Sequence, residues 1–314
     1  AKLEKLVADE PNDTAFHAEL ASVLMLRGDL PAAKSRIDVG LGISPNDADL
    51  LDLRSQLAKA SQGPSWRKSQ REEGVHFVVE TDLDKRAVRV IARVADEAMG
   101  QYEQVFGVPS DSQGKLPLFL FAGESSYKAY IQGVADANAE STLGIFSPLL
   151  KQVLVWNQSD RQGLIRVVRH EVMHAYMDRV LGFSPPWLAE GLSEFCAESK
   201  DEEGQWQAGG ICVDHLRVFE TYGLQKLSVD QLLHMPQEHF MANSNYTYPM
   251  AWAFVHFLLT TSPGNRAHFD AIWGRLKGRI GPMAATREVF QSVDMAALDK
   301  AFWEHVIALI QQHR

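Results

Sequence analysis

The sequence predicts an α+β fold in which a helical N-terminal segment precedes a small mixed sheet and a largely helical C-terminal part. Three observations predict it: a Pro-Asn-Asp triplet recurs near the N-terminus, strand-like apolar runs concentrate between residues 75 and 156, and helical periodicity dominates afterwards. The length of 314 residues favours two domains, and an apolar share of 46% suffices for a large core. We expect a helical repeat segment over 1–62, a linker over 63–73 and a second domain over 74–314, with the sheet in 74–200 and helices in 201–314.

The N-terminal segment has the pattern of a helical repeat. The Pro-Asn-Asp triplet at 11–13 recurs at 45–47, and between the two lie a helix, a Gly28-Asp29 turn and a second helix rich in Ala. Residues 1–10 and 47–61 are predicted as helices of neighbouring repeats. The pattern resembles a tetratricopeptide repeat, which implies a protein or peptide partner bound in a groove. A short helical cap without a ligand is the alternative, because one full repeat is fewer than the roughly three that stabilise a solenoid. The helices then either belong to an array cut short or pack on the next domain.

The following region predicts the sheet. Residues 62–73 are polar with Gly and Pro and are interpreted as a linker. Runs of β-branched, aromatic and apolar residues then predict strands at 75–81, 116–121, 144–146 and 152–156, and helical periodicity predicts helices at 83–106 and 125–132. Either 143–147 or 152–156 is expected to form an edge that could pair with an extended peptide.

The chemistry concentrates in the helix that follows the last of these strands. Ser159 and Gln162 have the spacing of a capping box, a wide apolar stripe follows, and Gly182 is a plausible stop. Within this helix the segment 170–174 reads His-Glu-Val-Met-His. Two histidines four positions apart lie on one helix face and can each offer a nitrogen to one zinc ion, while the intervening Glu171 can take a proton from water at the metal.

A second helix supplies the remaining ligand. Pro185 and Pro186 suit a helix start, and the segment 187–195 that follows contains Glu190 and Glu194 on one face. A catalytic zinc needs three protein ligands and one open position, and Glu190 can be the third ligand beside His170 and His174. Glu194 is expected to hold the free N–H of a zinc-bound histidine, and Asp178 is a weaker candidate for similar work.

These motifs resemble the gluzincin metallopeptidases, particularly the aminopeptidase N type and the related peptidase-MA-like families. His-Glu-x-x-His followed by Trp-Leu-x-Glu-Gly carries the resemblance. It implies a thermolysin-like zincin catalytic domain, one Zn²⁺, and Glu190 as the third ligand. The family pattern Tyr-x-x-Gly/Ala-x₆-Leu fits the segment that begins at Tyr248, which implies that its hydroxyl stabilises the oxyanion. Tyr246 is the second choice for that role, and His234 or His239 would match the histidine of the thermolysin type.

The predicted function is therefore zinc-dependent hydrolysis of a peptide or protein substrate. The family's aminopeptidases carry a Gly-x-Met-Glu-Asn segment that binds the free amine, and this chain has none, which favours an endopeptidase. The alternatives are an aminopeptidase, or an interaction protein whose repeats recruit partners while its metal site is structural or vestigial. An aminopeptidase would require a free amine on its substrate. An interaction protein would have a closed metal site with four protein ligands.

Composition excludes some classes of protein and leaves other questions open. A net charge of −9 with no dense basic stretch argues against nucleic-acid binding, and no apolar run approaches the roughly 20 residues of a membrane span. Cys196 and Cys212 are expected to be small buried side chains, although a disulfide between them is possible in an oxidising compartment. The sequence leaves compartment and oligomeric state open. Further helices are predicted at 211–222, 228–234, 247–261, 265–277, 282–291 and 295–312.

Overall fold

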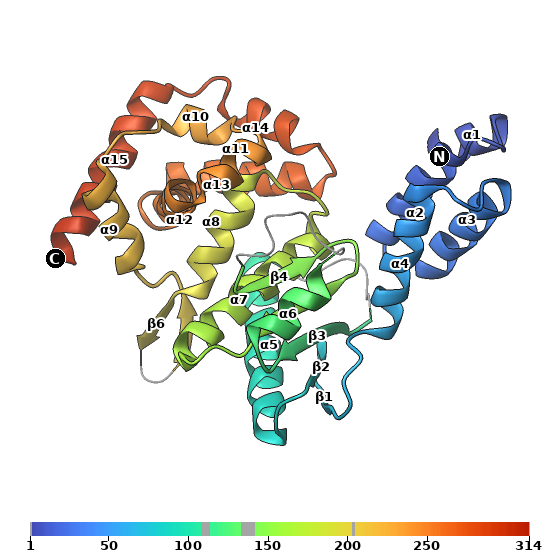
Figure 1. Ribbon diagram of the computed structural model, residues 1–314. Coiled ribbons are helices and arrows are strands. Elements are labelled where there is room, and N and C mark those ends of the chain that lie inside the picture. The colour runs from blue at the N-terminus through green and yellow to red at the C-terminus, as the bar shows by residue number, and fades with distance from the viewer. Residues whose placement is uncertain (1, 108–113, 133–141, 203–204, 314) are drawn as a thin grey trace. The chain divides into compact units, whose positions relative to one another are not determined.

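The computed structural model describes residues 2–107, 114–132, 142–202 and 205–313 (Figure 1). The chain divides into two compact units. One comprises Ala1–Glu97 and Gly114–Leu164, and the other comprises Ala98–Gln113 and Ile165–Arg314. The first unit contains the N-terminal helices and a small mixed sheet, and the second is largely helical, so the predicted α+β class is confirmed. The predicted domain boundaries at 62 and 74 stay predictions.

The N-terminal helices are α1 (Lys2–Asp9), α2 (Thr14–Leu26), α3 (Leu30–Ile43) and α4 (Ala48–Gln62). Two of them, α2 and α4, begin directly after the repeated triplet. The aspartate that ends each triplet is a helix cap: Asp13 accepts from the backbone N–H of Ala15, and Asp47 accepts from that of Leu50. The Thr14 hydroxyl donates to Asp47 at 2.8 Å, so the first residue of α2 is joined to the cap of α4.

These helices pack on the rest of the first unit. Leu150, from the turn at residues 148–151, is 2% exposed and belongs to the apolar core that α2, α3 and α4 share. The carbonyl of Lys59, near the end of α4, accepts from the Tyr130 hydroxyl at 3.2 Å and from the Gln152 side chain at 3.3 Å. These contacts agree with the expectation that the helices pack on the following part of the chain.

The sheet has five strands in the order β1-β2-β3-β5-β4. Their bounds are β1 (Gln70–Glu73), β2 (Phe77–Thr81), β3 (Leu116–Phe121), β4 (Gly144–Ser147) and β5 (Gln152–Trp156). The strands β2, β3 and β5 are parallel, and β1 and β4 are antiparallel edge strands. Of the two candidate edges, β4 is the edge and β5 is central, which agrees with the full burial of residues 152–155.

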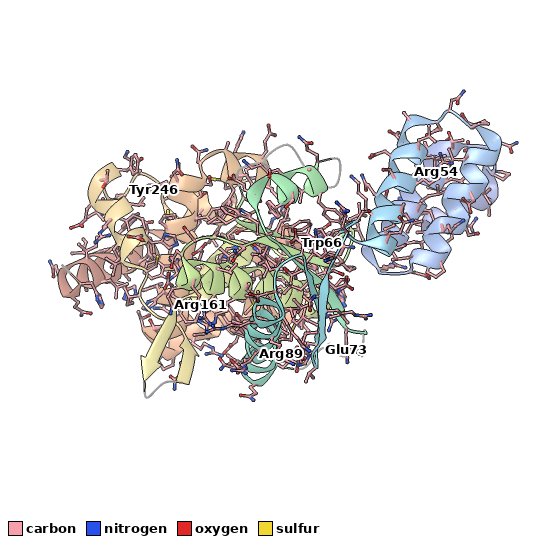
Figure 2. All side chains as sticks on the ribbon, turned by 60° about the horizontal axis from the view of Figure 1, so that its bottom comes forward. Arg54, Trp66, Glu73, Arg89, Arg161 and Tyr246 are labelled. Atoms are coloured by element: carbon pink, nitrogen blue, oxygen red, sulfur yellow. The ribbon has the colours of Figure 1, made fainter. Side chains whose placement is uncertain are left out.

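The predicted linker is partly wrong, because residues 70–73 form β1. This strand pairs with β2 but has the polar composition Gln-Arg-Glu-Glu and no buried residue, so its sequence carries no strand signal. Trp66, labelled in Figure 2, also lies within the predicted linker and packs edge-on against Phe119 and Phe121 of β3. The helices α5 (Lys85–Phe106) and α6 (Glu124–Ile131) lie close to their predicted ranges.

The second unit is built around α12 (Ser244–Thr260), whose residues 249–258 are all buried. Residues of α12 approach helices before and after it in sequence (Figure 1), namely α8, α9, α10, α11, α13 and α15. Such all-round burial agrees with its continuous apolar sequence. Within the described ranges, no helix combines the length and apolarity that a membrane crossing requires.

The remaining helices of this unit also follow the predicted ranges, with two additions that were not predicted. The additions are α11 and a hairpin of β6 and β7. The bounds are α7 (Arg161–Val180), α8 (Pro186–Ala197), β6 (Ser199–Glu202), β7 (Gln205–Ala208), α9 (Val213–Tyr222), α10 (Val229–Leu233), α11 (Gln237–Ala242), α13 (Pro263–Lys277), α14 (Pro282–Phe290) and α15 (Met295–Gln312).

Candidate metal centre

Two helices carry the predicted metal ligands, and local sequence explains where both begin. Asp160 caps α7, since its carboxylate oxygens each accept at 3.0 Å from the backbone N–H groups of Gln162 and Gly163. The predicted cap at Ser159 is therefore one residue too early. The α8 helix starts at Pro186, with Pro185 as its N-cap, as predicted.

The α7 and α8 helices run antiparallel, and side chains of opposite chemical type face each other in a ladder of pairs. Basic or imidazole side chains recur every four residues on α7, and carboxylates recur every four residues on α8. Each rung is one turn on from the previous one: the pairs are Arg166–Glu198 at 2.5 Å, His170–Glu194 at 3.2 Å and His174–Glu190 at 3.5 Å. This spacing is what places side chains of one helix face opposite those of the other.

The predicted ligands His170, His174 and Glu190 come together at one end of this ladder. The Nε2 atoms of the two histidines lie 3.0 Å apart, and Glu190 Oε2 lies 3.4 Å from His170 Nε2 and 3.5 Å from His174 Nε2. Ligands at about 2.0–2.1 Å from a tetrahedral zinc ion are separated from one another by about 3.3–3.4 Å. The three observed separations are close to that spacing, so the donor atoms fit one zinc ion.

Burial and charge strengthen this fit. Glu190 Oε2 is buried and makes no hydrogen bond within the described part of the chain, an arrangement that is costly unless a cation is nearby. Burial alone would raise the pKa of Glu190, but the neighbouring His174 and His170 rings outweigh it and hold that pKa far below its usual range. The carboxylate is therefore ionised, as a metal ligand must be.

Glu194 contacts the first histidine, while its predicted role in orienting that ring stays a prediction. Its Oε1 lies 3.2 Å from His170 Nδ1, so a proton on Nδ1 donates to the carboxylate and the Nε2 lone pair faces the other two ligands. Burial would lower the pKa of His170, but its contacts with Glu190 and Glu194 outweigh that effect and raise it. Metal binding must therefore displace a proton from this site.

Glu171 and Tyr248 lie within electrostatic range of the same centre. Glu171 is 7% exposed, and its charge acts on both His170 and Tyr248. Burial, followed by the charge of Glu190, raises the pKa of Tyr248 far above its usual range. The Tyr248 hydroxyl also contacts Met241 Sδ at 3.7 Å. Tyr248 is therefore a neighbour of Glu190, while the roles of Glu171 as the base and of Tyr248 as the hydroxyl donor stay predictions.

Sequence reasoning missed His215, on α9. Its Nε2 lies 3.1 Å from Glu194 Oε2, the carboxylate oxygen that does not face His170. Arg166 was missed as well, although its position four residues before His170 and eight before His174 places it on the ligand face of α7. The helical spacing could have predicted that Arg166 lies near the ligands, whereas no pattern in the sequence around His215 indicates that it lies there.

Other candidate residues have different surroundings. The Tyr246 hydroxyl, labelled in Figure 2, donates to the carbonyl of Gly223 at 3.2 Å, and His234 is exposed and bonds to the carbonyl of Asp230. His239 is exposed on α11, and Asp178 is half-buried on α7, one turn after His174. The roles assigned to these four residues stay predictions.

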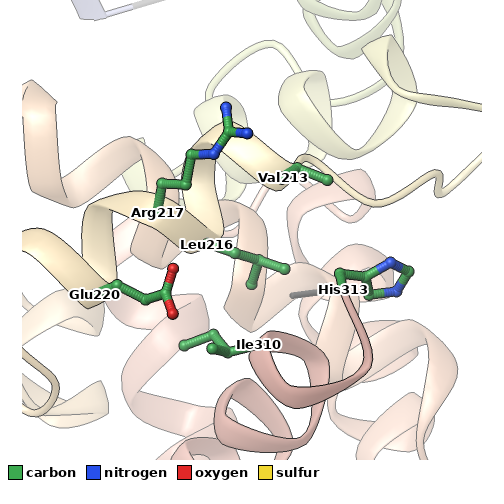
Figure 3. A pocket seen from close by; sticks show the side chains of 6 residues that line it. All are labelled: Val213, Leu216, Arg217, Glu220, Ile310 and His313. Atoms are coloured by element: carbon green, nitrogen blue, oxygen red, sulfur yellow. The ribbon is translucent and has the colours of Figure 1, made fainter.

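The two cysteines are buried and free, as expected for small core side chains, so the structure does not contain the alternative disulfide between Cys196 and Cys212. A separate pocket lies between α9 and the end of α15 (Figure 3). It contains none of the predicted site residues and is lined by Val213, Leu216, Arg217, Glu220, Ile310 and His313.

Comparison with known proteins assigns no family. No protein-family model matches the chain, and no curated protein sequence matches it significantly. The function of this protein therefore has to be inferred from the chemistry of the side chains at its candidate metal centre.

Proposed function

We propose that this protein is a zinc-dependent peptide-bond hydrolase of the gluzincin type, acting as an endopeptidase. One observation carries the proposal: the Nε2 atoms of His170 and His174 converge with Glu190 Oε2 in a largely buried cluster, at the separations that a tetrahedral zinc ion requires. A buried glutamate adjacent in sequence to the first ligand is the residue that metal-assisted hydrolysis of an amide needs as its base.

The chain's own residues divide the chemistry among them. His170, His174 and Glu190 would hold a zinc ion, which when bound polarises a carbonyl and makes water more acidic. Glu171 takes the proton that water releases on attacking the scissile carbonyl carbon and passes it to the nitrogen of the leaving amine. Tyr248 stays neutral because its pKa is raised, so its hydroxyl can donate a hydrogen bond to the oxygen that gains charge in the transition state.

Two observations favour a catalytic over a structural metal site. Among the described residues, the histidine, cysteine and carboxylate side chains that converge at this point number three, namely His170, His174 and Glu190. A structural zinc site is usually closed by four protein ligands, whereas a catalytic one keeps a position for substrate or water. An interaction protein with a vestigial site has no need of a base such as Glu171 or a hydroxyl donor such as Tyr248 beside the ligands.

The preference for an endopeptidase depends on the sequence. The chain lacks the Gly-x-Met-Glu-Asn segment whose glutamate binds the free substrate amine in aminopeptidases of this type. The helices α1 to α4, which we propose to be tetratricopeptide-like, would then contribute to the recruitment of a protein substrate or partner. We also propose that the catalytic domain has a thermolysin-like arrangement.

The test combines metal analysis with digestion of a peptide library. We expect one zinc per chain and cleavage of peptides whether or not their N-terminus is blocked; cleavage of unblocked peptides alone would indicate an aminopeptidase. Glu171→Gln should keep the zinc and lower turnover by about 10²–10⁴-fold, since a general base contributes that much. Glu238→Gln, an exposed glutamate of α11, is the control. A wild-type protein that binds zinc and cleaves no peptide would overturn the hydrolase proposal, whereas full activity of Glu171→Gln would refute the assignment of Glu171 as the base.

A further inference from the structure

The two oxygens of the Glu194 carboxylate are held by different imidazoles. Oε1 lies 3.2 Å from His170 Nδ1, and Oε2 lies 3.1 Å from His215 Nε2. Arg166 Nη2 is a further cation near Oε2, at 4.0 Å, but its shorter contact is with Glu198 at 2.5 Å. Glu194 is therefore a bridge between a predicted metal ligand and a histidine from another helix.

His215 is itself well fixed. It lies on α9, its side chain is 16% exposed, and its ring centre lies 5.5 Å from that of Trp252 on α12. Trp252 is fully buried. A ring packed in this way has few alternative rotamers, so the position of its Nε2–H is set by the packing of α9 on α12.

We infer that His215 is a positioning residue of the metal centre, acting through Glu194. The inference rests on the proposed function in that it takes His170 to be a metal ligand. A carboxylate can rotate about its last side-chain bond, and the hydrogen bond from His215 to Oε2 removes that freedom. With Oε2 held, Oε1 stays opposite His170 Nδ1, and the His170 ring presents the Nε2 lone pair to the metal.

Arg166 explains why loss of His215 would matter. Without the His215 donor, Oε2 would be a buried acceptor whose hydrogen-bond partner has been removed, which is costly. The Arg166 guanidinium is the cation already near Oε2, so the carboxylate would turn toward it. That movement draws Oε1 away from His170 Nδ1, so the His170 ring is no longer held in one orientation. The hydrogen bond from His215 thus opposes the electrostatic attraction between Arg166 and Glu194.

The experiment measures zinc affinity by competition with a chromophoric chelator, in wild type and in variants. His215→Leu removes the donor, and we expect the dissociation constant for zinc to rise about 10-fold, at the lower end of the range for residues that orient metal ligands. His215→Gln keeps an N–H donor of similar reach and should recover most of the affinity. His268→Leu, a half-buried histidine that packs on Phe290, is the matched control and should bind zinc as wild type does.

A double-mutant cycle separates positioning from simple packing. If His215 acts through Glu194, His215→Leu should change zinc affinity by less than about twofold when Glu194→Leu is already present. An equal loss in both backgrounds would show that His215 only packs against Trp252, and it would overturn the inference while leaving the proposed function intact. Unchanged affinity of His215→Leu would overturn it as well. A wild-type protein that binds no zinc would instead refute the metal centre on which the proposed function rests.

Discussion

Gly191 offers the sharpest test of how helix packing sets the candidate metal centre. This residue follows the proposed third ligand, Glu190, on α8, at the point where α8 packs against α12. A Cβ added at Gly191 would lie 2.7 Å from the carbonyl carbon of Ala251 and 2.8 Å from Val255 Cγ2, and closer still to the Ala251 oxygen. Two of these atoms are backbone, so the substitution Gly191→Ala has to move one helix relative to the other.

The size of the effect follows from two opposing contributions. The Ala251 oxygen is the nearest atom, so ordinary contact at about 3.4 Å requires the helices to separate by about 1 Å. Alanine favours a helix over glycine by about 0.8–1 kcal/mol, whereas overpacking a well-packed interior costs about 1–3 kcal/mol. Because the clash is with backbone, we expect the larger cost to prevail and the free energy of unfolding to fall by about 1–2 kcal/mol. A melting temperature lower by about 2–8 °C corresponds to that loss.

The same movement changes the distance between Glu190 on α8 and Tyr248 on α12. Displacements of about 1 Å at a catalytic site can cost about 100-fold in rate, so kcat/KM should fall between about 10- and 100-fold. The assays are calorimetry of the metal-free protein and steady-state kinetics on a peptide that the wild type cleaves.

Gly274→Ala is the matched control. Gly274 is also a helical glycine of the second unit, on α13, and an added Cβ there meets nothing within 4 Å. This variant should gain about 0.5–1 kcal/mol of stability and keep its activity. A Gly191→Ala protein that melts at or above the wild-type temperature, as Gly274→Ala should, would refute the reasoning about helix packing.

Three further predictions follow from named contacts. Tyr248→Phe removes the proposed donor to the oxyanion, so steady-state kinetics should show turnover lower by about 10²–10³-fold while metal analysis finds unchanged zinc; equal kinetics would assign the role elsewhere. Leu150→Ala leaves a cavity at a position that is 2% exposed in the core of α2 to α4. Denaturant titration should show the free energy of unfolding lower by about 2–5 kcal/mol, and a decrease below about 1 kcal/mol would contradict that packing. Burial raises the pKa of the Cys212 thiol to about 12 and also raises the pKa of the Cys196 thiol. A thiol reagent at neutral pH should therefore label neither cysteine in the folded protein and both after unfolding. Rapid labelling of the folded protein would contradict their burial.

Features that depend on neighbours along the chain could be predicted from the sequence. The caps of α2 and α4 follow from aspartates at the end of a repeated triplet, and the start of α8 follows from two prolines. The face shared by His170 and His174 follows from helical spacing alone. The convergence of Glu190 with these histidines was also predicted, because the motif that contains it is short and specific.

Features that depend on which distant segments meet could not be predicted in this way. The polar strand β1 becomes a strand only because β2 offers it hydrogen bonds, and β4 becomes the edge only because β3 pairs with β5. Likewise, no local pattern distinguishes His215 from the other histidines of the chain.

The sequence by itself determined most of the helices, the four apolar strands of the main sheet and the residue types that can bind a metal, since hydrogen bonding within a helix and side-chain periodicity are local. The tertiary structure decided that Glu194 is shared by His170 and His215 and that α12 brings Tyr248 toward Glu190. The physical reason is that burial and charge at the candidate metal centre come from four separate helices, α7, α8, α9 and α12, and their packing depends on the whole apolar core of the second unit.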